Sequence, residues 1–307
     1  MTNNIDWLRG CATALVTPFT RSGAIDETAL QRIVEYQIAG GVELLVPCGT
    51  TGESATMTEA EDQQVIKLVI DTAKGRARVI AGTGSNATAA AIEYSQTARA
   101  LGADAVLVVA PFYNKPTQDG LYSHFRAVAE SVTDLPVVIY NVPGRTSSNI
   151  NAETTLRLAR DVPNIVAVKE ASGNLSQIME ILRDRPAGFR VLSGDDSFTF
   201  ALLALGAEGL ISVAANEAPA LMSQMINLAL EGNWEQARAL HYRLLPLMEV
   251  NFIESSPGPV KAALAMMGLI EESFRLPLVP INEQSKTKLR AVIAELGLLK
   301  ETSHAAA

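Results

Sequence analysis

Short runs of consecutive apolar residues recur along the chain with longer, more polar segments between them. They predict β-strands at residues 12–16, 43–48, 78–82, 104–109, 136–140, 164–169, 190–193 and 208–213. The runs are nearly continuous in Val, Ile and Leu and do not alternate with polar residues. This pattern is typical of parallel strands whose outer face is covered by helices.

The segments between these runs carry apolar residues at helical spacing. The first, residues 26–39, begins with Asp26, a good capping residue, and is followed by two glycines, a usual helix stop. The next begins at Thr58, and Glu61 three residues later completes the pattern of a capping box. Further helices are predicted at residues 87–100, 120–131, 152–160, 175–183, 198–205 and 219–231.

Alternating strands and helices allow either a closed (β/α)8 barrel or a doubly wound open sheet. A doubly wound nucleotide-binding sheet has a glycine-rich loop after its first strand, whereas this chain has Thr17-Pro18-Phe19-Thr20 there. We therefore expect an α/β protein with a (β/α)8 TIM barrel over residues 1–232. Within residues 233–307, the apolar pattern predicts helices at 234–250, 259–267 and 283–298. We interpret this segment as a C-terminal helical domain.

Composition narrows the classes of function. The chain has 307 residues, 48% hydrophobic and 19% charged, with a net charge of −8, which argues against nucleic acid and anionic membranes as partners. No apolar stretch reaches the ~20 residues of a membrane span, and the first ten residues do not resemble a signal peptide. We expect a cytoplasmic enzyme with Cys11 and Cys48 as buried free thiols.

Lys169 is the most informative residue, because it stands at the end of the apolar run 164–169. Burying an ammonium is unfavourable, and loss of its proton is the simplest way to avoid that cost. A neutral amine is a nucleophile that forms Schiff bases with carbonyl compounds. The alternative is a lysine whose ammonium reaches past the strand end into solvent.

Active sites of (β/α)8 barrels lie at the carboxyl ends of the strands, so the residues after each strand are candidates. After the second strand, Thr50 and Thr51 stand between two glycines and can hold a carboxylate, unless the segment is an ordinary turn. Tyr113 follows the fourth strand, where the alternative is packing at an interface. The fifth ends in Tyr140, followed by Arg145, whose guanidinium suits a carboxylate; the alternatives are a core phenol and a surface salt bridge.

Other polar residues near the strand ends have less specific interpretations. Gly194 after the seventh strand permits close approach to a ligand, and Asp195 and Asp196 are interpreted as helix caps. Glu53 and Glu170 are expected to pair with each other or with capping amides. The three histidines lie far from these loops, so neither a zinc site nor a histidine triad is expected, and no metal is predicted.

Seven segments in this order resemble the dihydrodipicolinate synthase family, in the N-acetylneuraminate lyase superfamily of class I aldolases. They are GTTGES (49–54), AGTGSNAT (81–88), PFYNKP (111–116), YNVPGRT (140–146), VKEASGN (168–174), LSGDD (192–196) and GLISVAAN (209–216). The resemblance covers residues 10–299. It implies a homotetrameric lyase of lysine and diaminopimelate biosynthesis that condenses pyruvate with L-aspartate 4-semialdehyde. It also implies that no cofactor is needed, because the covalent imine forms on Lys169.

The resemblance also assigns roles to single residues. Lys169 forms the Schiff base with pyruvate, and Tyr140 shuttles protons through a relay with Thr50 and with a Tyr113 that reaches into a neighbouring subunit's site. Substrate binding is assigned to Thr51 for the pyruvate carboxylate, Arg145 for the semialdehyde carboxylate, and backbone carbonyls of Gly194 and Ile211.

Two finer expectations follow from comparing this chain with the family's pattern. Sister aldolases acting on N-acetylneuraminate or keto-deoxy sugar acids remain an alternative, although they usually lack an arginine at the position of Arg145. Lysine-inhibited members carry a regulatory site of which this chain keeps two residues and changes four. Those kept are Ser54 and Asn86, and those changed are Glu59, Asp62, Ala90 and Phe112. We expect weak or absent inhibition by lysine.

Overall fold

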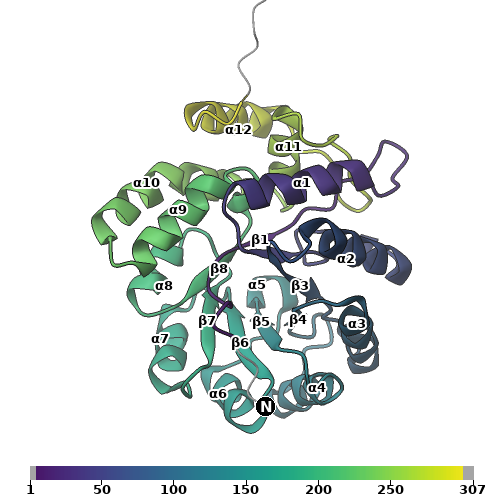
Figure 1. The fold of residues 1–307 in the computed structure, drawn as a ribbon, viewed down its shortest axis with the longest axis vertical. Helices are drawn as coiled ribbons and strands as arrows, with labels where there is room; N and C mark the ends of the chain where they lie inside the picture. Colours follow the sequence, from purple (N-terminus) through teal and green to yellow (C-terminus); the bar gives the residue numbers. More distant parts are fainter. Residues whose placement is uncertain (1–4, 300–307) are drawn as a thin grey trace, which may run out of the picture.

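The computed structural model describes residues 5–299 and contains a closed barrel of parallel strands (Figure 1). The strands pair in chain order, and the last pairs with the first. They are β1 (Gly10–Ala14), β2 (Leu44–Val46), β3 (Arg78–Gly82), β4 (Ala105–Val109), β5 (Val137–Asn141), β6 (Ile165–Glu170), β7 (Arg190–Ser193) and β8 (Gly209–Ser212). This arrangement confirms the predicted (β/α)8 barrel, and every predicted strand lies within two residues of an observed one.

Helices connect successive strands and surround the barrel in Figure 1. They are α1 (Glu27–Ala39), α2 (Glu59–Ala73), α3 (Thr88–Leu101), α4 (Gln118–Glu130), α6 (Ala152–Asp161), α7 (Leu175–Asp184), α8 (Thr199–Ala204) and α9 (Pro219–Leu230), with the short elements η1 (Ser54–Thr56), α5 (Pro143–Thr146) and η2 (Ala214–Asn216) in three of the loops. Asp26 accepts a hydrogen bond from the Ala29 amide, and Thr58 and Glu61 form the expected capping box.

The barrel has an inner and an outer apolar layer, because neighbouring residues of a strand face opposite sides. Ala12, Leu44, Ile80, Val138 and Ile211 belong to the inner cluster. The larger outer cluster joins the opposite faces of the strands to the apolar faces of the helices. Since both faces are buried, the strands read as continuous apolar runs, which is why they were recognisable in the sequence.

Three further helices follow the barrel: α10 (Trp234–Val250), α11 (Gly258–Met266) and α12 (Glu283–Glu295). Helix α10 packs against α9, and α12 packs against both α10 and α11. The last helix ends three residues before the predicted end, because Gly297 has a left-handed backbone (φ +74°) that stops it. The proposed domain boundary at 232/233 falls in the turn between α9 and α10. The last residues of the predicted helical domain, 300–307, lie outside the described part of the chain.

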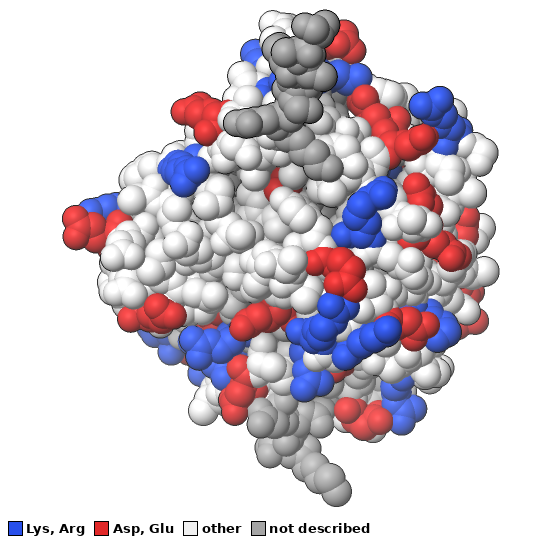
Figure 2. All heavy atoms as spheres, turned by 45° about the horizontal axis from the view of Figure 1, so that its top comes forward, with Lys and Arg blue, Asp and Glu red and all other residues white. Residues whose placement is uncertain are grey.

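The surface carries charges of both signs side by side. Figure 2 shows Lys and Arg side chains next to Asp and Glu on parts of the displayed face, beside a broad area without charged side chains. Surface ion pairs include those of Arg76 with Glu35 and of Arg99 with Asp134. Within residues 5–299, no helix is both long and apolar enough to cross a membrane. Cys11 and Cys48 are both buried and free, as expected.

Candidate active site

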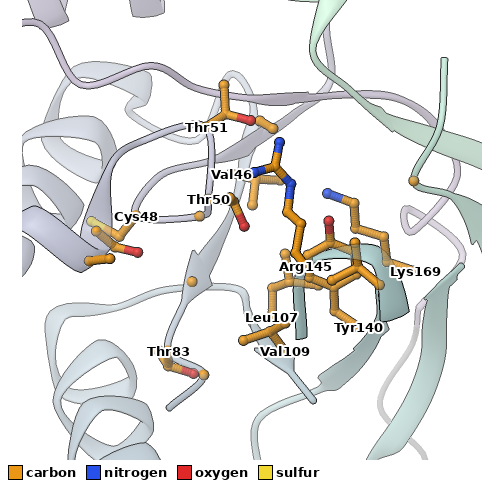
Figure 3. A pocket seen from close by; sticks show the side chains of 18 of the residues that line it. Val46, Cys48, Thr50, Thr51, Thr83, Leu107, Val109, Tyr140, Arg145 and Lys169 are labelled. Atoms are coloured by element: carbon orange, nitrogen blue, oxygen red, sulfur yellow. The ribbon is translucent and has the colours of Figure 1, made fainter. Parts of the chain in front are cut away.

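A cavity of about 600 Å³ opens at the carboxyl ends of the strands (Figure 3). It collects residues that are far apart in sequence, because the loops after parallel strands all emerge at the same end of the barrel. Of the eight predicted site residues, six line it: Thr50, Thr51, Tyr140, Arg145, Lys169 and Gly194. The fold therefore brings most of the predicted set together around one cavity.

Lys169 occupies the fifth position of β6, and its neighbour across the β5–β6 ladder is Tyr140. Its side chain is 6% exposed and points into the cavity, with Nζ 4.2 Å from the centre of the Tyr140 ring (Figure 3). Burial lowers the pKa of Lys169 from 10.5 to about 7, the nearby charge of Asp196 opposes this shift, and the cationic Arg145 adds to it. A substantial fraction of the amine is then neutral at pH 7. The alternative of a lysine that reaches into solvent is wrong.

Tyr140 lies beneath the lysine, at the cavity end of β5, and is 7% exposed. Burial raises the pKa of Tyr140 to about 12, and the positive charge of Arg145 acts in the opposite direction. The phenol is therefore protonated at neutral pH. It can donate a proton or a hydrogen bond to a group that forms on Lys169.

The Gly49–Glu53 loop after β2 is a tight, hydrogen-bonded turn. The Gly52 amide donates to the Gly49 carbonyl and the Glu53 amide to the Thr50 carbonyl, both at 3.1 Å. A Cβ on Gly52 would lie 3.1 Å from the Leu15 carbonyl oxygen, so the turn is pressed against the end of β1. Thr51 is buried and Thr50 exposed, and both lie at the edge of the cavity in Figure 3.

Arg145 lies in α5, and its guanidinium extends toward the space in front of Lys169 (Figure 3). Its amide donates to the Val142 carbonyl at 3.0 Å, which fixes the start of this short helix. Within residues 5–299 the guanidinium forms no ion pair, so the alternative of a surface salt bridge is not observed. An exposed cation facing a cavity next to an amine suits a ligand with a carboxylate.

The remaining three predicted residues, Gly194, Ile211 and Tyr113, differ in how they lie relative to the cavity. Gly194 faces the lysine so closely that a Cβ there would lie 3.0 Å from Lys169 Cε and 2.8 Å from the Ala171 side chain. Ile211 is fully buried in β8, within the inner cluster and not among the cavity-lining residues. Tyr113 is 88% exposed with a left-handed backbone (φ +72°), and it does not line the cavity of its own chain.

Asp196 does not cap α8, the helix that follows it, so this prediction is wrong. Its side chain instead connects two loops of the site. Its carboxylate is 2% exposed and accepts hydrogen bonds from the Ser212 hydroxyl and from the Val213 and Ala214 amides. It thereby ties the loop after β7 to the loop after β8. Asp195 does accept hydrogen bonds from the amides of Ser197 and Phe198 in the turn before α8.

The two glutamates that adjoin the site do not pair with each other. The Glu170 carboxylate accepts hydrogen bonds from the Asn141 and Gln177 side chains and from the Ser172 amide. Glu53 instead forms a buried ion pair with Lys261 of α11, a residue that the sequence analysis did not predict as its partner. The available signal was a single cation within the apolar segment 258–266. Among residues 5–299, no group of three or more acidic, His or Cys side chains is arranged to hold a metal ion.

Comparisons with known proteins show the family to which the chain belongs. The sequence profile of the Dihydrodipicolinate synthetase family matches residues 7–296. A 4-hydroxy-tetrahydrodipicolinate synthase from Koribacter versatilis is 52% identical over 297 residues, which cover 96% of this chain and 98% of the relative.

Solved structures agree as well. A dihydrodipicolinate synthase from Aquifex aeolicus superposes with a TM-score of 0.93 at 46% identity, over 95% of this chain and 99% of that one. The synthase from Acinetobacter baumannii, described as chloride-inhibited and complexed with pyruvate, gives 0.92 at 44% identity, over 95% and 99%. The chain therefore belongs to the dihydrodipicolinate synthetase family, and its chemistry is that of the 4-hydroxy-tetrahydrodipicolinate synthases, lyases of lysine biosynthesis.

Proposed function

We propose that the cavity condenses pyruvate with L-aspartate 4-semialdehyde to 4-hydroxy-tetrahydrodipicolinate through an imine on Lys169. The observation that carries this proposal is a buried lysine with its pKa lowered to about 7, facing the same cavity as Arg145 and the Thr50-Thr51 turn. The pyruvate complex of the Acinetobacter baumannii relative supports the choice of first substrate.

The reaction begins when the neutral amine of Lys169 adds to the keto carbon of pyruvate. The resulting carbinolamine loses water to give a protonated imine, which makes the pyruvate methyl group acidic. Loss of a methyl proton gives an enamine, whose carbon attacks the aldehyde carbon of the semialdehyde. The semialdehyde's own amine then adds to the imine carbon, and Lys169 leaves as the amine while the ring closes.

Proton transfer in these steps needs a donor beside the lysine, and we assign it to Tyr140. Its phenol stays protonated at neutral pH and lies against Nζ of Lys169. Thr50 extends the relay toward solvent. Tyr113 is the third member of this relay, and it acts in the cavity of a neighbouring subunit, because it stands outside its own cavity and is exposed.

Assembly as a homotetramer is part of the same proposal. In addition to Tyr113, large apolar side chains are exposed on the face formed by α7 and α8, where Leu175, Met179 and Leu205 are 37%, 41% and 42% exposed. Apolar groups gathered in this way are typical of surfaces that become buried between subunits. Sedimentation of the purified protein as a monomer at micromolar concentration would contradict this assembly.

Binding of substrate carboxylates distinguishes this activity from that of sister aldolases. We assign Thr51 and the backbone of its turn to the pyruvate carboxylate, with the carbonyls of Gly194 and Ile211 nearby. We assign Arg145 to the carboxylate of the semialdehyde. A neutral sugar offers nothing for this guanidinium to bind, so Arg145 favours the acidic partner.

The function is tested by trapping and by substrate choice. Borohydride added with pyruvate should reduce the imine and leave a stable adduct on Lys169, located by mass spectrometry. A coupled assay should then show turnover of pyruvate with aspartate 4-semialdehyde and little with N-acetylmannosamine. An adduct on another residue would overturn the assignment of Lys169, and preference for the sugar would overturn the choice of second substrate.

Feedback by lysine is proposed to be weak or absent. Glu59, Asp62 and Phe112 are among the residues that line the cavity. Ala90 on α3 has no carboxylate to meet an α-ammonium, and Phe112 has no hydroxyl to donate. The retained Ser54 and Asn86 are poor substitutes for these contacts. Activity measured against lysine concentration should stay above half up to ~1 mM, a range in which a well-formed site would be saturated.

A further inference from the structure

A second buried lysine lies behind the Gly49–Glu53 loop. Lys261 of α11 has no exposed surface, and its ammonium forms an ion pair with Glu53, whose side chain is equally buried. The same ammonium donates to the Thr17 carbonyl at 3.1 Å. It also lies 4.4 Å from the centre of the Phe19 ring and 4.9 Å from that of Phe274. The pair is therefore enclosed by aromatic rings and backbone, away from solvent.

Glu53 is held in an unusual backbone conformation where it meets this lysine. Its φ of +56° is left-handed, which is unfavourable for a residue with a side chain and persists only when the surroundings hold it. The Glu53 amide closes the turn by donating to the Thr50 carbonyl, and its own carbonyl accepts from the Thr56 amide and hydroxyl. The ion pair attaches this turn directly to α11, one of the C-terminal helices.

The sequence separation explains why this contact matters. Glu53 is two residues from Thr51 and three from Thr50, whereas Lys261 belongs to a helix that follows the whole barrel. A displaced Glu53 would move the turn on which both threonines stand. Misplacement of a binding group by about 1 Å is enough to reduce activity ~10²-fold.

We propose that Lys261 and Glu53 form a positioning pair, through which the C-terminal helices hold Thr50 and Thr51 in the place where the pyruvate carboxylate binds. This inference rests on the proposed function, since it assigns the pair an effect on pyruvate. Neither residue lines the cavity, so both act through the turn and touch no substrate.

The experiment compares Lys261→Met, Glu53→Gln and the double variant by borohydride trapping. The measured quantity is the pyruvate concentration that gives half-maximal adduct, which depends on binding and not on the amount of folded protein. Lys261→Met should raise it by about 10-fold or more, because the turn loses its anchor. Glu53→Gln keeps an acceptor of the same length and should raise it by less than ~3-fold.

The double variant separates positioning from stability. With no unpaired carboxylate left in the interior, it should recover most of the melting temperature lost in Lys261→Met. Its half-maximal pyruvate concentration should nevertheless stay high, because no contact replaces the anchor. If Lys261→Met does not fold, the double variant alone carries the test. Recovery of normal pyruvate binding in the double variant would reduce the pair to a structural role and overturn the proposal.

A matched control is the ion pair between Arg185 and Glu208. It is also largely buried, with side-chain exposures of 21% and 17%. Glu208 directly precedes β8, so this pair lies at the amino ends of the strands, opposite the cavity. Arg185→Met should lower stability and leave the half-maximal pyruvate concentration unchanged; an equal rise in this variant would contradict a specific role for Lys261. Absence of any adduct in the unmodified protein would instead refute the proposed function, so the two failures are distinguishable.

Discussion

The two buried lysines of this protein show how one side chain serves opposite purposes. Lys169 and Lys261 are both enclosed, and both have the ammonium against an aromatic ring. Burial lowers the pKa of each. They differ in what faces the nitrogen: Lys169 faces an open cavity, whereas Lys261 faces the Glu53 carboxylate and the Thr17 carbonyl.

This difference teaches that burial alone does not make a lysine reactive. At Lys261, the attraction of Glu53 opposes the effect of burial and supports the charged, hydrogen-bonded form. At Lys169, no carboxylate within residues 5–299 forms an ion pair with the nitrogen, and the charge of Asp196 acts only from a distance. We therefore propose the nitrogen without a salt-bridge partner, that of Lys169, as the nucleophile, and the paired nitrogen of Lys261 as an anchor.

The largest expected effect is on catalysis at the unpaired lysine. Lys169→Ala should lower kcat/KM by at least about 10³-fold, because Lys169 is the one lysine among the described residues that line the cavity. The coupled assay measures this, with the exposed Lys67→Ala as a control that should keep full activity. Substantial activity remaining in Lys169→Ala would show that the barrel lysine is not the nucleophile.

The paired lysine should have the larger effect on stability. Lys261→Met leaves the Glu53 carboxylate buried without a partner, so the free energy of unfolding should fall by about 3–5 kcal/mol. Urea denaturation at pH 7 measures it. A change below ~1 kcal/mol would mean that water reaches the pair and that the enclosure inferred here does not hold.

Lys169→Met should have the opposite sign. The folded protein holds the Lys169 proton less tightly than the unfolded chain, since the pKa falls from 10.5 to about 7. The penalty for burying the ammonium is therefore complete below pH 7 and fades as pH rises toward 10.5. Removing the charge should raise the free energy of unfolding by about 2–4 kcal/mol at pH 6. The gain should be smaller at pH 9, and a gain independent of pH would contradict the lowered pKa.

The smallest expected effect is the change in the pKa of Lys169 when the charge of Asp196 is removed. Asp196 raises the pKa of Lys169, so Asp196→Asn should move the acid limb of the rate of imine formation to lower pH by a few tenths of a unit. The rate of trapping from pH 5.5 to 8 measures the shift. Asp71→Asn, on the exposed face of α2, is the control, since it removes a carboxylate charge that does not act on Lys169. A shift to higher pH would show that the lost hydrogen bonds outweigh the lost charge.

Much of the fold could be predicted from local sequence, and so could the burial of Lys169, one of the two lysines compared above. The strands were recognisable because parallel strands buried on both faces are apolar throughout, and the caps at Asp26 and Thr58 satisfy amides only three residues away. Lys169 stood out because a cation at the end of an apolar strand is unfavourable without a reason. Thr50, Tyr140 and Arg145 were found because strand ends in a barrel converge.

The sequence by itself determined the barrel, the buried lysine near the end of β6 and most of the predicted residues that line the cavity, because these depend on periodicity and on residues next to strand ends. Only the tertiary structure decided which buried groups meet. Glu53 and Lys261 are separated by 208 positions, and nothing local to either indicates the other. Asp196 was expected to cap the next helix, yet it bonds to the loop after β8. A buried charge pairs with an oppositely charged group that lies next to it in the folded protein. The order of residues along the chain does not show which group that is.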